Sequence, residues 1–421
     1  MRLRLAAFVL LLAACGASSS PAPATSAAPA PVQQGPVCDP DNGGLVLPAG
    51  FCALRLGDSL GPVRHLAIAP NGDLFVARSG QTGGLALMRD TSGDGRIDVV
   101  RQIYPGGGTG VLLTGDAVYY APNDRVIRFP WRVGSFEPAG PADTLILDLP
   151  TTGHGAKTLA MGRDGQLYVN IGSWTNSCQV QNRQAQSPGV QPCTELEGRA
   201  GIWRFDPTKT RQTLADGQRF ATGLRNAEAI AIEPVTGTLY AAVHGRDQLT
   251  QNWGFPEEEG AENPAEEFGP ITQGADYGWP YCYYDPRNKV KVISPEYGGD
   301  GKQVGDCDDK HQPAIAFPAH WAPISTSFYT GSRFPSEYRG GAFIAFHGSW
   351  NRGTTPEAQQ GFRVVFAPFR DGRPTGTWDT FARPAGAHNS VRPTGLAVGP
   401  DGSLYIGADR EQRIWRVFYR P

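Results

Sequence analysis

The sequence predicts an all-β chain built as a six-bladed β-propeller, on the evidence of its repeats and its turn residues. A phrase of two apolar strands around a tight turn with Gly occurs at 66–77, 159–170, 230–241 and 396–407. Its second strand is rich in aromatic and β-branched residues, which is typical of a β-hairpin. The 54 Gly and 36 Pro among 421 residues supply many turns. Repeats of this length bury their apolar faces only by stacking around an axis, as propeller blades do.

The N-terminus has the features of a secretion signal. Residues 1–15 contain a charged start and an apolar core that is too short to span a bilayer. The core ends in Leu-Ala-Ala-Cys15, which resembles a bacterial lipoprotein signal, so we expect Cys15 to be lipidated. Plain secretion after cleavage at an Ala is the alternative. Residues 16–36 are rich in Ala, Ser and Pro and would form a flexible tether. With Cys15 lipidated, we expect the protein at the outer membrane, facing the periplasm. Without lipidation, the protein would be secreted or found at the cell surface.

Residues 37–421 are expected to form the propeller. Clear hairpins lie near 63–79, 155–172, 227–243 and 393–408, and weaker ones at 110–129 and 340–369 fit the gaps. The segment at about 247–325 is expected to be a long insertion, and long ordered loops on a rigid β scaffold often carry binding sites. We expect the C-terminal strand, 413–419, to close the ring against the sheet of the first blade.

Six cysteines follow Cys15 in what we expect to be an oxidising compartment. Their spacing favours disulfides between neighbours along the chain: Cys38–Cys52, Cys178–Cys193 and Cys282–Cys307. The absence of a Cys-x-x-Cys-His motif and of zinc-ribbon spacing argues against a covalent haem and a zinc ribbon.

The net charge of −2, without any Lys/Arg-rich run, argues against a nucleic-acid partner. We expect contact with a membrane only through the N-terminal lipid anchor.

Polar segments occur where the predicted strands begin or end. In a propeller, the residues directly before the innermost strand of each blade converge on the central axis. We therefore expect His154, Arg225, Arg392 and either His244 or His347 to face one cavity. Several cations around one cavity call for an anionic ligand.

These segments resemble those of the soluble quinoprotein glucose/sorbosone dehydrogenases, in particular the sorbosone-dehydrogenase-like branch. The resemblance covers roughly 47–419, and its most specific strings lie at 154–173, 223–226, 246–247, 277–280, 347–352 and 392–395. It implies a six-bladed propeller that holds pyrroloquinoline quinone (PQQ), a tricarboxylate, together with a calcium ion at its axis.

The resemblance also implies roles for individual residues. His154 would be the base that takes the proton of a sugar hydroxyl while hydride passes to the quinone. PQQ would be held by Arg225, Asn226, Arg352 and Arg392, and Ca²⁺ by the backbone carbonyls of Gly245 and Arg246. The expected function is a PQQ- and calcium-dependent dehydrogenase of a sugar or a related alcohol or aldehyde. Its partners would be this small-molecule substrate and an unidentified electron acceptor in the periplasm.

Three positions depart from the glucose-type members. Ser173 stands where they have the Asp that orients the catalytic His, Arg246 where they have Pro, and Ser390 where they have a further Arg. These departures argue against glucose specificity. A non-catalytic propeller lipoprotein with a binding or envelope role is the alternative function. A lactonase-type hydrolase is less favoured, because the expected axial residues are Arg and His rather than Glu, Asn and Asp.

The segment 90–98 is similar to the first half of a calcium-binding loop. Arg101 occupies the position that requires a bidentate Glu, and a hairpin turn explains the segment as well.

Overall fold

The computed structural model describes residues 37–353 and 355–421, which lie within one compact unit, Pro36–Pro421. The predictions of a signal peptide at 1–15, of lipidation at Cys15 and of a tether at 16–36 lie outside the described residues. No described helix is long and apolar enough to cross a membrane.

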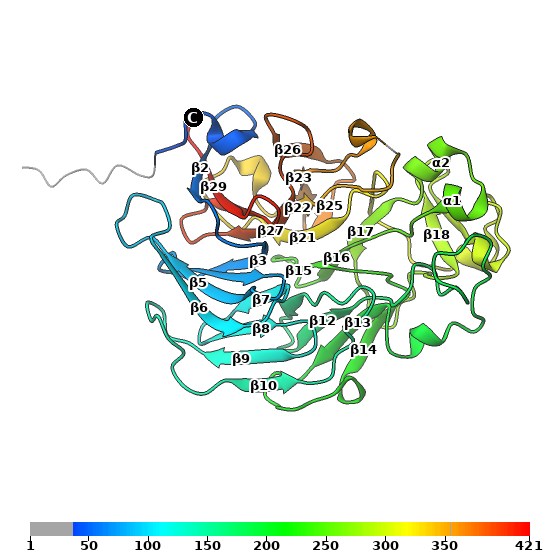
Figure 1. Cartoon of the computed structure of the whole chain (residues 1–421), viewed down its shortest axis with the longest axis horizontal. Helices are drawn as coiled ribbons and strands as arrows, with labels where there is room; N and C mark the ends of the chain where they lie inside the picture. Colours follow the sequence, from blue (N-terminus) through cyan, green and yellow to red (C-terminus); the bar gives the residue numbers. More distant parts are fainter. Residues whose placement is uncertain (1–36, 354) are drawn as a thin grey trace, which may run out of the picture. The chain divides into compact units, whose positions relative to one another are not determined.

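Six antiparallel sheets form the six blades, so the predicted propeller is confirmed (Figure 1). The first blade consists of β3 (Val63–Ile68), β4 (Leu74–Arg78), β5 (Gly84–Arg89) and β6 (Val99–Pro105). The second consists of β7 (Gly110–Leu113), β8 (Ala117–Ala121), β9 (Val126–Pro130) and β10 (Asp143–Ile146). The third consists of β11 (Leu159–Met161), β12 (Leu167–Ile171), β13 (Gly201–Phe205) and β14 (Gln218–Thr222).

The other three blades complete the ring. The fourth consists of β15 (Ala229–Ile232), β16 (Leu239–Val243), β17 (Glu266–Pro270) and β20 (Ile315–Phe317). The fifth consists of β21 (Pro323–Phe328), β22 (Ala342–Phe346), β23 (Arg363–Ala367), β26 (Asp379–Pro384) and β1 (Leu45–Val46). The sixth consists of β27 (Pro393–Val398), β28 (Leu404–Ala408), β29 (Arg413–Tyr419) and β2 (Phe51–Gly57).

The first strands of successive blades contact one another in a closed ring, in the order β3, β7, β11, β15, β21 and β27. The blades pack face to face through apolar side chains. Between the first two blades, for example, Phe75 and Trp131 meet edge to face with ring centroids 4.9 Å apart. The ends of the innermost strands are therefore brought together around the axis.

The ring is closed by strands from both ends of the chain. β29 pairs with β2, with Phe51 opposite Tyr419 and Ala53 opposite Val417, so the sixth blade contains strands from both ends of the chain (Figure 1). β29 also lies against the first blade as predicted, because its Ile414 and Phe418 belong to the same apolar cluster as Val63 of β3. The pairing of β29 with β2 was not predicted. β2 precedes the first repeat of the hairpin phrase, and it supplies the outer strand that the C-terminal blade lacks.

The fifth blade also begins earlier than predicted. Its innermost strand is β21, rather than a strand after residue 340. The sequence of β21, Pro-Ile-Ser-Thr-Ser-Phe, has hydroxyl side chains where the other innermost strands have apolar ones. This strand consequently lacks the hairpin phrase.

The segment between β16 and β21 contains the predicted insertion. It holds α1 (Leu249–Trp253), α2 (Glu257–Glu262) and a hairpin of β18 (Cys282–Asp285) and β19 (Val290–Ile293). A smaller hairpin, β24 (Phe369–Arg370) with β25 (Arg373–Pro374), lies in the fifth blade segment. The three predicted disulfides are all present: Cys38–Cys52, Cys178–Cys193 and Cys282–Cys307.

Candidate active site

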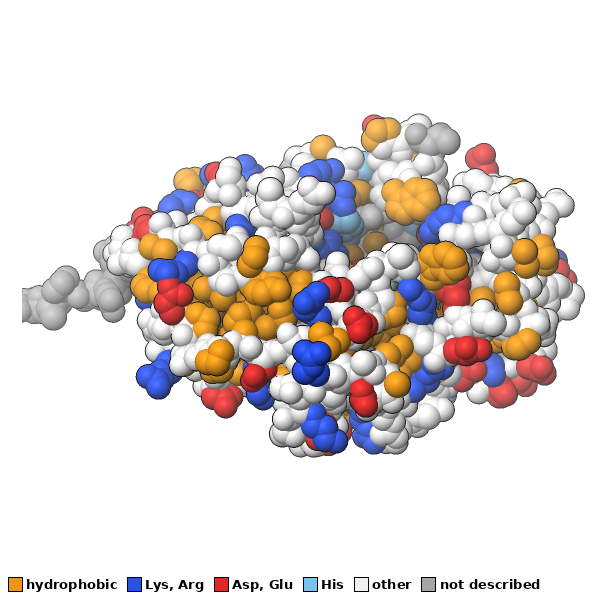
Figure 2. Space-filling model, turned by 60° about the horizontal axis from the view of Figure 1, so that its bottom comes forward, with side chains coloured by type: hydrophobic (Ala, Val, Ile, Leu, Met, Phe, Trp, Pro, Cys, Tyr) orange, Lys and Arg blue, Asp and Glu red, His pale blue; other side chains and the backbone are white. Residues whose placement is uncertain are grey.

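A cavity of about 330 Å³, which we call the axial cavity, lies at the ends of the innermost strands. Histidine side chains are visible inside a hollow of the surface in Figure 2, next to Lys and Arg side chains. The charged and imidazole groups that line the axial cavity are His154, His244, His320, His347, Arg64, Arg183, Arg225, Glu228, Asp247 and Glu266. The cavity is therefore strongly polar and carries both signs of charge.

The structure brings several predicted site residues together. His154, Arg225, Asn226 and Gly245 all line the axial cavity, although they come from the third and fourth blades and the loops between them. Both alternative histidines, His244 and His347, line it as well.

His154 is held in one orientation by Ser173. Its Nδ1 lies 3.0 Å from the backbone carbonyl oxygen of Ser173 and 3.0 Å from the Oγ. Because a carbonyl oxygen only accepts, Nδ1 carries the proton of the neutral ring, and the lone pair is on Nε2. Burial, with smaller effects of Arg225 and His244, lowers the pKa of His154 to about 3. His154 is therefore neutral near pH 7, and its Nε2 can accept a proton.

Arg225 is bound into the wall of the cavity. Its guanidinium donates to the carbonyl oxygens of Asn176 and Gly245, to the side chain of Asn176 and to Asp247 Oδ2, which is 3.0 Å away. A guanidinium has five N–H groups. These bonds occupy four of them, which leaves one N–H group of Nη1 without a partner among the described residues.

Carboxylates form ion pairs with the cations of the axial cavity. These ion pairs were not predicted from the sequence. Asp247 pairs with both Arg183 and Arg225, and Arg64 pairs with Glu228. The expectation that these cations by themselves require an anionic ligand therefore does not hold.

The carboxyl groups differ in charge state. Burial opposes ionisation of Asp247, but Arg225, His320 and Arg183 hold its pKa well below the usual range. Burial raises the pKa of Glu266 to about 7. The cavity thus contains at least one permanent carboxylate beside its guanidinium groups.

Sequence reasoning missed Arg64, Glu228 and Glu266 as cavity residues. Arg64 lies in β3, at the start of the first hairpin, so the rule that identified His154 could have found it. Glu228 lies directly before β15 and was available to the same rule. Glu266 is in β17, which no repeat marks.

The two predicted calcium ligands differ in their placement. The carbonyl oxygen of Gly245 accepts from Arg225 Nη1 at 2.8 Å, so an ion there would share this oxygen with a cation. The Arg246 side chain is buried against Glu296, with 2.6 Å between Nη1 and Oε2, and Arg246 is not part of the cavity wall. Asp247, the next residue, does line the cavity and offers a carboxylate to a cation.

Two predicted cofactor ligands lie outside the axial cavity wall. Arg352 donates to the carbonyl oxygens of Ala261 and Ala319 and pairs with Glu262. Arg392 contacts His347, with its Nε 3.0 Å from His347 Nε2, and it pairs with Asp409. Neither Arg352 nor Arg392 is among the residues that line the axial cavity.

Two buried amide oxygens of the cavity wall, Asn226 Oδ1 and Asn351 Oδ1, have no hydrogen-bond partner among the described residues. Oxygen atoms of this kind suit a hard cation, and guanidinium N–H groups suit carboxylates. A set that combines guanidinium groups, an ionised carboxylate and unpartnered amide oxygens fits an anionic cofactor bound together with a divalent cation.

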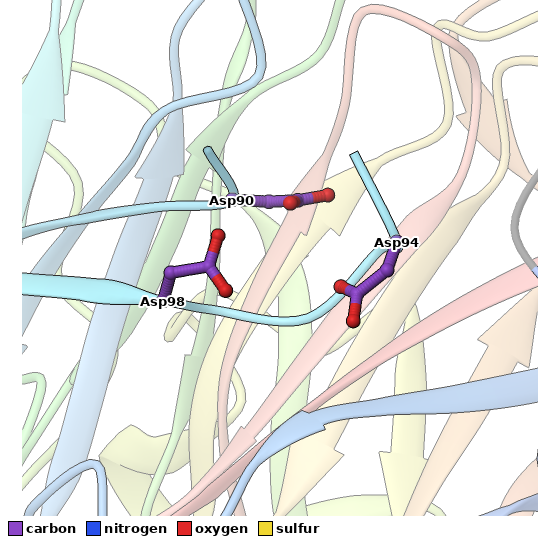
Figure 3. Close-up of side chains that lie close together, drawn as sticks. All are labelled: Asp90, Asp94 and Asp98. Carbon is purple, nitrogen blue, oxygen red and sulfur yellow. The ribbon is translucent and has the colours of Figure 1, made fainter. Parts of the chain in front are cut away.

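The calcium-like loop lies between β5 and β6, outside the axial cavity. The carboxylates of Asp90, Asp94 and Asp98 lie within 4.8 Å of one another (Figure 3). Asp90 accepts from the backbone N–H groups of Gly93 and Gly95, as the side chain of a tight turn does. The hairpin-turn interpretation therefore accounts for this segment.

A family model described as TrAA12-like matches residues 45–420. An uncharacterized protein of Borreliella burgdorferi is 29% identical over 205 residues, which are 47% of this chain and 48% of that protein. The match thus spans about half the length of this curated relative.

Solved structures with the same fold were also found. A calcium structure of a Trichoderma reesei enzyme of Carbohydrate-Active Enzymes Family AA12 has a TM-score of 0.74 at 19% identity, covering 89% of this chain and 97% of that chain. The holo form of the pyranose dehydrogenase PQQ domain of Coprinopsis cinerea has a TM-score of 0.74 at 19% identity, covering 92% and 99%. The apo form of the soluble aldose sugar dehydrogenase of Escherichia coli has a TM-score of 0.59 at 17% identity, covering 88% and 100%.

Proposed function

The chain belongs to the TrAA12-like family, and we propose that it is a quinoprotein dehydrogenase that uses PQQ and Ca²⁺ to oxidise a sugar or a related alcohol or aldehyde. One observation carries this proposal: a neutral histidine presents its free Nε2 to a cavity that contains groups suited to an anion and to a divalent cation. Neighbours in fold are described as a pyranose dehydrogenase PQQ domain and an aldose sugar dehydrogenase, which agrees with this chemistry.

The residues that would hold the cofactor follow from the cavity. Arg225 would give its remaining N–H to a carboxylate of PQQ, and Asn226 and Arg64 would bind polar atoms beside it. To bind PQQ, the Arg392 side chain would have to turn away from His347. Asp247 and the Gly245 carbonyl would hold Ca²⁺. When bound, PQQ supplies a two-electron acceptor and Ca²⁺ a Lewis acid that polarises it.

The protein itself supplies the base and its surroundings. His154 Nε2 takes the proton of the substrate hydroxyl, and the resulting imidazolium keeps its Nδ1–H bond to the Ser173 carbonyl. Burial of the ring and the neighbouring Arg225 disfavour the imidazolium, so the proton is released to solvent after each turnover.

We expect PQQ to bind the purified protein more tightly when Ca²⁺ is present. Titration calorimetry should give heat of binding with PQQ and Ca²⁺ together, and at least about tenfold weaker binding after chelation of the metal. Reduction of a dye by added sugars then tests the dehydrogenase activity. Absence of heat with both ligands would refute the cofactor assignment.

A non-catalytic binding role is the second candidate. Two observations favour it: Ser173 provides no charge to stabilise the imidazolium, and the cavity arginines are already paired with carboxylates. A sugar or an anion that binds without any dye reduction would support this role.

For the N-terminus we propose a lipid anchor on Cys15 and an outer-membrane location facing the periplasm. The small residues directly before Cys15 carry this proposal. Globomycin should cause the unprocessed precursor to accumulate in a bacterial host, and Cys15→Ala should abolish labelling with a fatty acid. Normal processing of the Cys15→Ala protein would instead indicate plain secretion.

A further inference from the structure

A second hollow of about 270 Å³, which we call the outer hollow, lies beside the axial cavity. Trp350 and Asn351 line both spaces. The rest of its wall includes Gln248, Thr250 and Gln251, from α1 and the residue before it. The two spaces therefore share a wall formed by Trp350 and Asn351.

Trp350 is unusually exposed for its size. Its exposed fraction is 64%, although tryptophan is highly buried on average. The Arg183 guanidinium lies 5.8 Å from the centre of the Trp350 ring, and Arg183 also donates to Gln248. These contacts with Arg183 place the flat indole beside amide groups at the junction of the two spaces.

The charges of the outer hollow argue against an anionic ligand. Arg352 is the one cation among its described lining residues, and Glu262 and two carbonyl oxygens already bind it. Glu257 adds a carboxylate whose side chain has no hydrogen-bond partner among the described residues.

The polar groups of the wall also exclude a wholly apolar ligand. Gln248, Gln251 and Thr250 line the outer hollow with polar side chains. Gln248 Oε1 accepts from Arg183 and Thr250 Oγ1 donates to the carbonyl oxygen of Pro256. A buried donor, Arg352 Nε, and a buried acceptor, Asn351 Oδ1, lack partners among the described residues. A flat apolar ring surrounded by hydrogen-bond donors and acceptors is suited to a sugar, which has a C–H face and several hydroxyl groups.

We propose that the outer hollow binds the second sugar ring of an oligosaccharide whose terminal ring occupies the axial cavity. The preferred substrate is then a saccharide of two or more units rather than a monosaccharide. This inference rests on the proposed function, because it assigns the sugar that the dehydrogenase oxidises.

Binding of defined sugars tests the outer hollow directly. Calorimetry would compare glucose with cellobiose and cellotriose, and with maltose and maltotriose, on the protein with and without PQQ and Ca²⁺. We expect the di- and trisaccharides of at least one series to bind about tenfold more tightly than glucose. Equal affinity for glucose and both trisaccharides overturns the proposal.

Two variants localise the effect. Trp350→Ala should reduce the ratio of trisaccharide to glucose affinity to near one, and Gln251→Ala, an exposed position, should lower it about threefold. Trp174→Ala is the matched control, because Trp174 is similarly exposed, at 58%, and lines neither space. An equal loss in Trp174→Ala and Trp350→Ala would contradict the assignment.

The outcomes separate the two proposals. Turnover of sugars by the PQQ-loaded enzyme without any preference for chain length would refute the outer hollow and leave the dehydrogenase intact. Tighter binding of oligosaccharides, lost in Trp350→Ala, by a protein that takes up no PQQ would refute the dehydrogenase and keep the sugar site.

Discussion

Replacing His154 with Gln should lower the turnover of the PQQ-loaded enzyme by about 10²- to 10⁴-fold, which is the usual contribution of a positioned base. The amide of Gln fills a similar volume and can still hydrogen-bond Ser173, but it has no basic nitrogen for the substrate proton. Binding of PQQ should change little, since Arg225 and Asp247 remain in place. Steady-state rates and calorimetry on the same preparation measure both quantities.

The pH dependence of the rate follows from the lowered pKa of His154. Protonation removes the lone pair, so the rate falls as the pH drops through the pKa of this ring. Burial lowers that pKa to about 3. We therefore expect no acid limb from His154 near neutral pH in wild type. Ser173→Asp places a carboxylate beside Nδ1 and should move the acid limb to higher pH.

His65→Gln is the control for this experiment. His65 is also buried near the axis, and burial lowers its pKa to about 4, but its Nε2 binds the carbonyl oxygen of Ile324 and it does not line the axial cavity. Its replacement should leave the pH profile unchanged. Equal turnover of wild type and His154→Gln would remove His154 from the mechanism and point to His244 or His347.

The fold and the family could be predicted because the repeats are local. A strand, a turn with Gly and a second strand lie within 12 residues of sequence, as at 66–77, so each hairpin is visible without knowledge of its neighbours. The strands that were not identified from the sequence depend on distant partners. β2 finds β29 across most of the chain, and β21 is identified by its neighbours in the ring rather than by its own apolar pattern.

The candidate site could be predicted only where a residue precedes an innermost strand. This rule placed His154 and Arg225 correctly in one cavity. It could not show that Arg352 turns toward Glu262, because that ion pair joins the fifth blade to the insertion. Nor could it show the pairing of arginines with carboxylates, which depends on side-chain directions rather than on strand order.

The largest effect on stability is expected for Asp247→Ala. The Asp247 carboxylate lies 3.0 Å from Arg225 and 2.8 Å from Arg183, and it accepts from Asn351 Nδ2 at 2.9 Å. The Arg225 side chain is 4% exposed, so the variant leaves a buried cation without its counter-charge. Removing one partner of a buried pair costs about 3–5 kcal/mol, and the free energy of unfolding in denaturant should fall by that amount. Calcium-dependent binding of PQQ should be lost with it.

The pH dependence and a control distinguish this role of Asp247 from general destabilisation. Because its pKa is lower in the folded than in the unfolded protein, the pair stabilises the fold above the ordinary pKa of Asp, and this stability is lost as the pH falls below about 4. Asp247→Ala should therefore lose less stability than wild type on acidification. Asp73→Ala removes another buried partner, that of Arg89, far from the axial cavity, and should destabilise the protein without weakening PQQ binding. Only Asp247 lies where the cofactor and the cation are proposed to meet. A comparable loss of PQQ affinity in Asp73→Ala would therefore show that Asp247 acts through the fold alone.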